Sequence, residues 1–184
     1  PDPGRATAGK LGPGIPESYQ HCLPYHYGFA VNPDDPVGYH LDETFQWIDL
    51  CASLGIKILN VSAGSPYYNP HIQRPAAYPP SDGYQPAHDP LIDVERQIQV
   101  VRQLKAKTPG NMVVVGSAYS YLQEYLPHVA QHNVREGWTD MVGLGRVILS
   151  YPDMLSDATT KGVILPKMIC RTFSDCTTAP RNGL

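Results

Sequence analysis

The sequence lacks the charge pattern of a nucleic-acid-binding protein and the apolar runs of a membrane protein. It has 14 Lys and Arg against 17 Asp and Glu, for a net charge of -3. The basic residues are dispersed and form no stripe. No apolar stretch approaches the length that spans a bilayer, and no charged segment followed by an apolar one is visible as a secretory leader. We therefore expect a small-molecule substrate, with no nucleic-acid and no membrane partner.

Cysteine is also scarce. The four cysteines are Cys22, Cys51, Cys170 and Cys176, and only the last two are close to each other in the sequence. In a domain of this size such spacing is typical of reduced thiols rather than of a disulfide framework. The pattern favours a cytoplasmic protein.

Two common cofactor motifs are absent. The dinucleotide motif G-x-G-x-x-G fails at Gly143, because G-L-G-R-V-I has no third glycine. His128 and His132 stand four residues apart, but H-V-A-Q-H lacks the glutamate of the zinc protease motif. We interpret both histidines as surface residues and predict no metal site.

Length and composition suggest part of a larger fold. The 184 residues suffice for one domain, whereas a complete (β/α)8 barrel has roughly 250. The chain opens on Pro1 without an initiator methionine, so we expect an internal starting point. The 19 prolines and 12 tyrosines concentrate near the start and between residues 66 and 90. They predict two long ordered loops, over residues 1–40 and 65–90.

Hydrophobic periodicity alternates between the helical and the extended pattern. It predicts helices over 41–54, 91–107 and 120–136, and strands over 56–63, 112–116 and 140–145. Gly55 suits the end of the first helix, and Pro127 marks the true first turn of the third. Helices alternating with strands indicate parallel crossover units of an α/β fold. This pattern leaves two architectures open, an arc of a barrel and an open doubly wound sheet.

The stretch from Asp140 to Asp153 carries the clearest chemical signal. A short apolar strand there contains Gly143 and Gly145 and is followed at once by Arg146. Glycine lets a ligand approach the main chain, and a guanidinium can bind two phosphate oxygens. An earlier strand, Val113 to Ser117, also ends in a glycine and a small residue. Two such turns in succession are typical of the phosphate site after strands 7 and 8 of a barrel.

Each of these features also has a structural explanation. The glycines could serve packing in a buried parallel strand, and Arg146 could be a structural cap that pairs with Asp153. The order of the two turns, together with the arginine, favours the phosphate site.

With these elements assigned, the chain resembles the old yellow enzyme family of flavin-dependent oxidoreductases. G-L-G-R-V-I-L-S-Y-P-D resembles the strand-8 motif of that family, V-V-V-G-S its strand-7 turn, and L-N-V-S-A-G its strand 6. The resemblance covers residues 1–184 and implies the C-terminal part of one TIM (β/α)8 barrel domain, with strands 6–8 and their helices. Residues 1–40 would then be the loop after strand 5, and residues 151–184 a tail after the barrel.

The resemblance implies an FMN-binding enzyme. Hydride would pass from NAD(P)H to the flavin and on to an acceptor such as an activated alkene. Gly116, Ser117, Gly145 and Arg146 would hold the FMN phosphate. The catalytic side chains of the family lie in the first half of the barrel, so none is assigned here, and we expect the fragment alone to be inactive.

Two further segments are interpreted with this resemblance. Tyr67 and Tyr68 follow strand 6 and are candidates for the substrate rim, with aromatic packing of the loop as the equal alternative. Some family members bind an iron–sulfur cluster after the barrel through C-x2-C-x3-C. Here Phe173 replaces the second cysteine between Cys170 and Cys176, so we predict two structural thiols and no cluster.

Two alternatives to the flavin enzyme remain at this stage. One is a phosphate-binding barrel without flavin, such as a sugar-phosphate isomerase or an aldolase, because the phosphate turn does not identify the chemistry. The other is an inert half barrel with exposed strand edges. The sequence does not indicate the oligomeric state.

Overall fold

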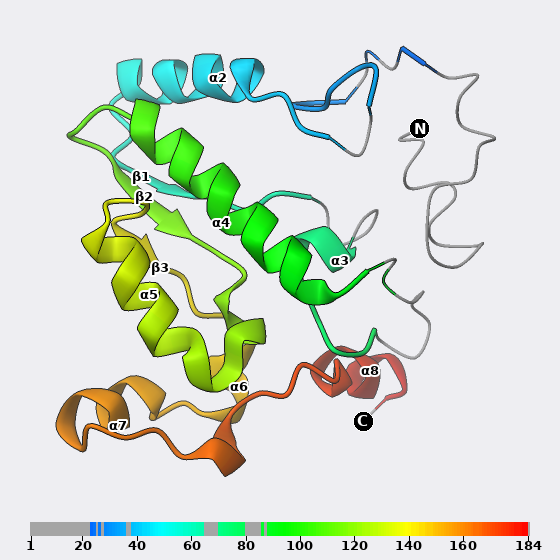
Figure 1. The fold of residues 1–184 in the computed structure, drawn as a ribbon, viewed down its shortest axis with the longest axis vertical. Coiled ribbons are helices and arrows are strands. Elements are labelled where there is room, and N and C mark those ends of the chain that lie inside the picture. Colours follow the sequence, from blue (N-terminus) through cyan, green and yellow to red (C-terminus); the bar gives the residue numbers. More distant parts are fainter. Residues whose placement is uncertain are drawn as a thin grey trace.

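The computed structural model describes residues 23–24, 26, 28–35, 38–64, 70–79, 86 and 88–183. Its described elements are α2 (Asp42–Ser53), β1 (Ile58–Asn60), α3 (Pro70–Gln73), α4 (Pro90–Lys107), β2 (Val113–Gly116), η2 (Tyr119–Tyr125), α5 (Leu126–Arg135), β3 (Met141–Val142), α6 (Arg146–Ser150), α7 (Met154–Thr160), η3 (Pro166–Met168) and α8 (Asp175–Arg181). Figure 1 shows the order along the chain. None of the helices among the described residues is long and apolar enough to cross a membrane.

The three described strands form one parallel sheet in the order β1-β2-β3. Leu59 is in register with Val114, and Gly116 with Val142. Each strand follows a helix, namely α2, α4 and α5. The parallel pairing confirms the prediction of crossover units.

The helices begin and end where local sequence signals predict. Asp89 caps α4, because its side chain accepts a hydrogen bond from the N–H of Leu91 at 2.8 Å. Gly55 has a φ of +80° directly after α2, a backbone conformation that glycine adopts without strain. Pro127 lies in the first turn of α5, and the preceding residues form the 3-10 turn η2. The third helix therefore has the short lead-in that its proline predicts.

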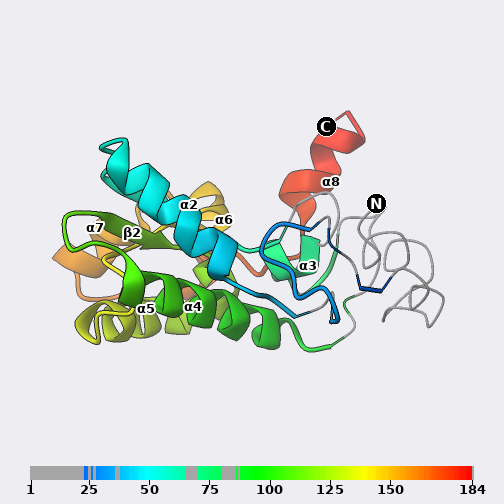
Figure 2. The same ribbon diagram turned by 90° about the horizontal axis from the view of Figure 1, so that it is seen from above.

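Helices and strands bury one face of the sheet in two clusters. The first joins α2, β1 and α4 and consists of Leu41, Ile48, Cys51, Leu59, Val100, Leu104 and Met112. The second joins α4, α5 and the tail and consists of Val94, Ile98, Tyr119, Leu126, Val147, Tyr151, Met154 and Ile169. Figure 2 shows α4 and α5 along the same side of β2.

The opposite face of the sheet is open. Ile58 is 63% and Met141 57% exposed, although both are apolar strand residues. Register puts Ile58 opposite Val113, and Val115 opposite Met141, so these residues share that face. A parallel sheet normally has both faces covered, so we expect this face to have a partner. A barrel arc and an open sheet both satisfy the observed strand order.

The strands are shorter than predicted. The periodicity indicated 56–63 and 140–145, but β1 and β3 span only Ile58–Asn60 and Met141–Val142. Beyond β1, the N–H and C=O of Ala63 bond to the buried amide of Gln97 instead of to a neighbouring strand. A side chain thus replaces the strand ladder at that point.

The Pro/Tyr loop predicted over residues 65–90 contains a short helix, α3. Pro70 occupies its first position, and the N–H of Arg74 bonds to the carbonyl of Pro70 at 2.7 Å. Proline is favourable there because its fixed φ suits a first helical turn. In the segment predicted as a loop over 1–40, the described residues include an antiparallel bridge between Val31 and Tyr39.

Candidate functional site

The two predicted phosphate turns lie side by side at the carboxyl ends of β2 and β3. Gly116 ends β2 and pairs with Val142, and the N–H of Gly143 donates to the carbonyl of Gly116 at 2.8 Å. Ala118 follows with a φ of +75°. A non-glycine residue in the left-handed region is uncommon and tends to mark a functional turn.

The glycines of the site differ in what surrounds them. A Cβ on Gly116 would lie in close contact, at 3.4 Å, with both Thr139 Oγ1 and the Tyr119 ring. A Cβ on Gly145 would have no atom of the described residues within 4 Å. Only Gly145 therefore borders open space that a ligand could use.

Ser117 is held from the first strand. Its hydroxyl donates to Asn60 Oδ1 at 3.2 Å, across the ends of β1 and β2. Sequence analysis did not single out Asn60. Its position as the last residue of β1, next to the end of β2 in the parallel sheet, is the signal that could have identified it.

The guanidinium of Arg146 is only partly satisfied. Nη2 donates to the carbonyl of Pro75 at 2.5 Å. Nη1 is buried and has no hydrogen-bond partner among the residues that the structure describes. None of the ion pairs found in those residues involves Arg146, so the predicted alternative of a cap paired with Asp153 is not observed.

Burial, reinforced by the positive charge of Arg74, lowers the pKa of Arg146 to about 10. The group nevertheless stays charged at neutral pH. A buried cation without a counter-charge destabilises the fold, and a bound anion would relieve that cost.

The tail fixes the loop that contacts Arg146. Ala77 N donates to Thr172 Oγ1 at 2.9 Å, and Ser174 Oγ donates to the carbonyl of Tyr78 at 2.7 Å. The rings of Tyr78 and Phe173 meet at 5.4 Å. Phe173 stands where the C-x2-C-x3-C motif would have its second cysteine, and its ring packs against Tyr78.

A buried glutamine holds the other part of this loop. Gln97 is fully buried on α4, and its amide bonds to both backbone groups of Ala63 and to the carbonyl of Ile72 at 2.8–2.9 Å. Local patterns do not reveal this contact, because Gln97 lies within an ordinary helical pattern.

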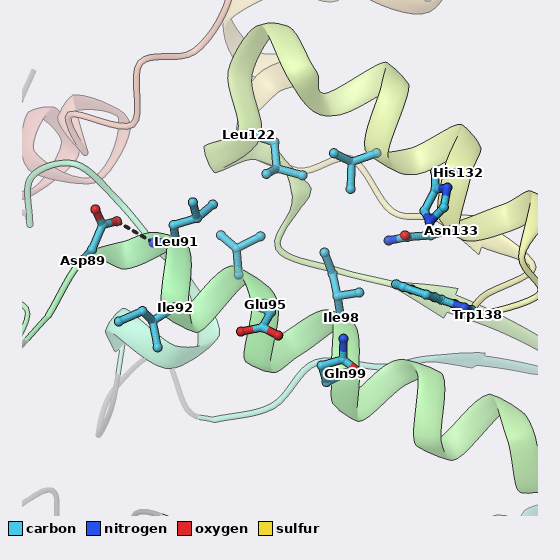
Figure 3. Close-up of a pocket in the computed structure, with 12 residues that line it drawn as sticks. Asp89, Leu91, Ile92, Glu95, Ile98, Gln99, Leu122, His132, Asn133 and Trp138 are labelled. Carbon is cyan, nitrogen blue, oxygen red and sulfur yellow. Dashed lines mark hydrogen bonds between the residues drawn. The ribbon is translucent and has the colours of Figure 1, made fainter.

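A separate groove opens on the helical side of the sheet (Figure 3). It has a volume of about 600 Å³ and runs between α4 and the η2–α5 segment. Its lining includes Ile98, Leu122 and Trp138 and none of the predicted phosphate residues. His132 contacts the Trp138 ring edge-on at 5.4 Å, and both His128 and His132 are exposed, as predicted.

The predicted rim tyrosines, the cysteines and the metal-binding residue types differ in how far the structure describes them. Tyr67 and Tyr68 lie outside the described residues, as does Cys22. Cys51, Cys170 and Cys176 are free thiols. The described part of the chain contains no group of three or more His, Cys, Asp or Glu side chains that could hold a metal ion.

Comparison with known proteins assigns no family. No family model matches the chain, and no curated protein or solved structure matches it. The functional argument therefore depends on the geometry at the carboxyl ends of β2 and β3 and on the sequence motifs there.

Proposed function

We propose that the chain is part of an FMN-dependent oxidoreductase of the old yellow enzyme type. In this proposal Arg146, Gly145, Gly116 and Ser117 hold the FMN phosphate, and the reaction takes hydride from NAD(P)H to an acceptor such as an activated alkene. The protein is cytoplasmic, and its catalytic side chains lie outside this chain.

The observation that carries the proposal is the unpartnered Nη1 of Arg146. It is a buried cationic donor next to the turn that follows β3, and its sister nitrogen is already bound to the carbonyl of Pro75. Buried donors without partners are rare, and a bound anion is one standard explanation. A phosphate oxygen would supply both a hydrogen bond and a negative charge.

The fold is compatible with a barrel arc. Parallel strands in sequential order, each after a helix, are what three consecutive barrel units would contain. The open face with Ile58 and Met141 corresponds to the side that a closed barrel fills with side chains. We therefore propose strands 6–8 for β1, β2 and β3.

The residues at this site fit the phosphate end of FMN. Bound FMN supplies the hydride-accepting group. Arg146 binds the phosphate charge, Gly145 leaves room for its approach, and Ser117 is oriented by Asn60. Together they anchor one end of the cofactor, which fixes the position of the other.

The test is to titrate FMN and riboflavin, which lacks the phosphate, into apo-protein. A charge-assisted hydrogen bond contributes roughly 1.5–3 kcal/mol, so Arg146→Ala should weaken FMN binding by about ten- to a hundredfold. Arg146→Lys should recover part of that loss, because lysine keeps the charge but not the planar fork. Riboflavin should bind all variants equally.

Arg135→Ala is the matched control, because Arg135 is exposed on α5 and bonds only to Gln131 in the described part of the chain. Its binding should equal that of the wild type. Equal losses of FMN and riboflavin in Arg146→Ala would contradict a phosphate site. A purified protein that never shows flavin absorbance but binds a sugar phosphate would favour the isomerase or aldolase alternative.

A further inference from the structure

Two arginines from distant parts of the sequence converge on the same site. Arg146 follows β3, and its Nη2 donates to the carbonyl of Pro75, the residue after Arg74. Arg74 follows α3, and its Nη2 donates to Ser174 Oγ at 3.3 Å. The tail thus orients Arg74 in the same loop whose backbone orients Arg146.

Neither arginine has a carboxylate partner in the part of the chain that the structure describes. Burial and then the charge of Arg74 lower the pKa of Arg146, and the thiols of Cys170 and Cys176 act in the opposite direction without cancelling these effects. Two guanidiniums in this arrangement repel one another, and removing one of them from water adds a further cost. An anion between them would compensate both charges at once.

We propose that Arg74 is the second arginine of the anion site and that the pair selects a doubly charged phosphate monoester over singly charged anions. The proposal rests on the proposed function for the identity of the ligand. Two observations carry it. Arg146 Nη1 has no hydrogen-bond partner among the described residues, and Arg74 has no ion pair among them.

Ser174 is a positioning residue in this scheme. It is 3% exposed and has a φ of +65°, and its hydroxyl both accepts from Arg74 and donates to the carbonyl of Tyr78. Thr172 nearby is also buried and left-handed, with a φ of +56°. Such backbone is maintained only when surrounding contacts determine it, and functional sites are where it concentrates.

The experiment measures the affinity of apo-protein for FMN and riboflavin between pH 5 and 7.5. A phosphate monoester gains its second charge near a pKa of about 6. Wild-type affinity for FMN should therefore rise severalfold across this range, while riboflavin affinity stays constant. Arg74→Gln should weaken FMN binding about tenfold at pH 7.5 and should flatten its pH profile.

Two further variants keep the test decisive. Arg74→Lys retains a charge at the same position and should restore most of the pH dependence, even if Arg74→Gln folds poorly. Ser174→Ala removes only the orienting hydroxyl and should give a smaller loss of FMN affinity with riboflavin binding unchanged. Arg135→Gln again serves as the control for loss of one positive charge.

The outcomes separate the inference from the proposed function. If Arg74→Gln binds FMN as the wild type does while Arg146→Ala binds it weakly, the two-arginine site is wrong and the FMN site stands. If neither variant affects FMN, the proposed function fails as well. An equal loss of FMN and riboflavin in Arg74→Gln would assign Arg74 a structural role and overturn the inference.

Discussion

The two ends of β3 each have a charged side chain, and the two are satisfied very differently. Asp140, just before the strand, accepts hydrogen bonds from Lys105 Nζ and from the N–H of Val114, both at 2.7 Å. Arg146, which follows the strand, has one carbonyl partner and one buried nitrogen that has no partner among the residues described by the structure. In barrels the amino ends of the strands serve stability and the carboxyl ends serve chemistry. The contrast across β3 follows this division.

Backbone conformation divides in the same way. Before β1 and β3 the left-handed residues are Gly55 and Gly137, which adopt a positive φ without strain. After β2 Ala118 and Gln123 are left-handed without being glycine. In the tail Thr172 and Ser174 are left-handed as well, beside Gly162 and Gly183. Local exceptions to sequence rules are expected where function requires them. Thr172 and Ser174 belong to the tail that holds the loop contacting Arg146.

The largest change in the free energy of unfolding is expected when the hydrogen bonds of Gln97 are removed. Gln97→Leu would leave both backbone groups of Ala63 and the carbonyl of Ile72 without this partner in a partly buried site. Each buried unsatisfied group costs about 1–3 kcal/mol, so we expect a loss of about 3 kcal/mol in the free energy of unfolding. Urea denaturation measures it. Gln99→Leu on the same helix is the control. An equal loss of unfolding free energy in Gln99→Leu would show that the hydrogen bonds of Gln97 are not the cause.

A smaller effect is expected at the satisfied end of β3. Asp140→Asn should lower the free energy of unfolding by about 1–2 kcal/mol, because it weakens the charge-assisted bonds to Lys105 and Val114. The exposed Asp49→Asn on α2 should leave the unfolding free energy unchanged.

The pH dependence gives a second readout for Asp140. Burial favours its neutral form, but Lys105 and the N–H of Val114 together outweigh burial and hold its pKa below the usual value. Its stabilising contribution is therefore present above the unfolded-state pKa and disappears as pH falls through the folded-state value. Asp140→Asn should lose less stability than the wild type on acidification. Parallel pH profiles would argue against the ion pair.

The smallest effect on stability is expected at Gly145. Nothing lies within 4 Å of a Cβ placed there, so Gly145→Ala should melt within about 1 °C of the wild type, as surface changes without contacts do. FMN affinity should nevertheless fall, because the methyl group occupies the space that we assign to the ligand. Gly116→Ala should change stability more than Gly145→Ala does, because its Cβ would contact Thr139 Oγ1 and the Tyr119 ring at 3.4 Å. Unchanged FMN affinity in Gly145→Ala would show that the ligand does not use this space.

The elements and the proximity of the two turns could be predicted from the sequence. Hydrophobic periodicity and capping residues are signals within a short stretch of sequence, so they predict the helices and strands. Parallel pairing then brings the ends of β2 and β3 to one edge of the sheet. The contacts that orient the arginines could not be predicted. Arg74 and Ser174 are 100 residues apart, and Arg146 and Pro75 are 71 apart, so only tertiary folding brings them together. The short length of β1 also depended on a side chain, Gln97, that local patterns do not reveal.

The most direct test of Arg146 as an anion-binding residue compares the free energy of unfolding of two variants with and without FMN. Without ligand, Arg146→Met should match the wild type within about 1 kcal/mol, because replacing a buried uncompensated charge by an apolar side chain is often neutral or stabilising. At an FMN concentration of about 100 times its Kd, the wild type should gain about 2.7 kcal/mol, and Arg146→Met should gain much less at the same concentration. A variant that melts far below the wild type without ligand, yet gains as much from FMN, would contradict the account.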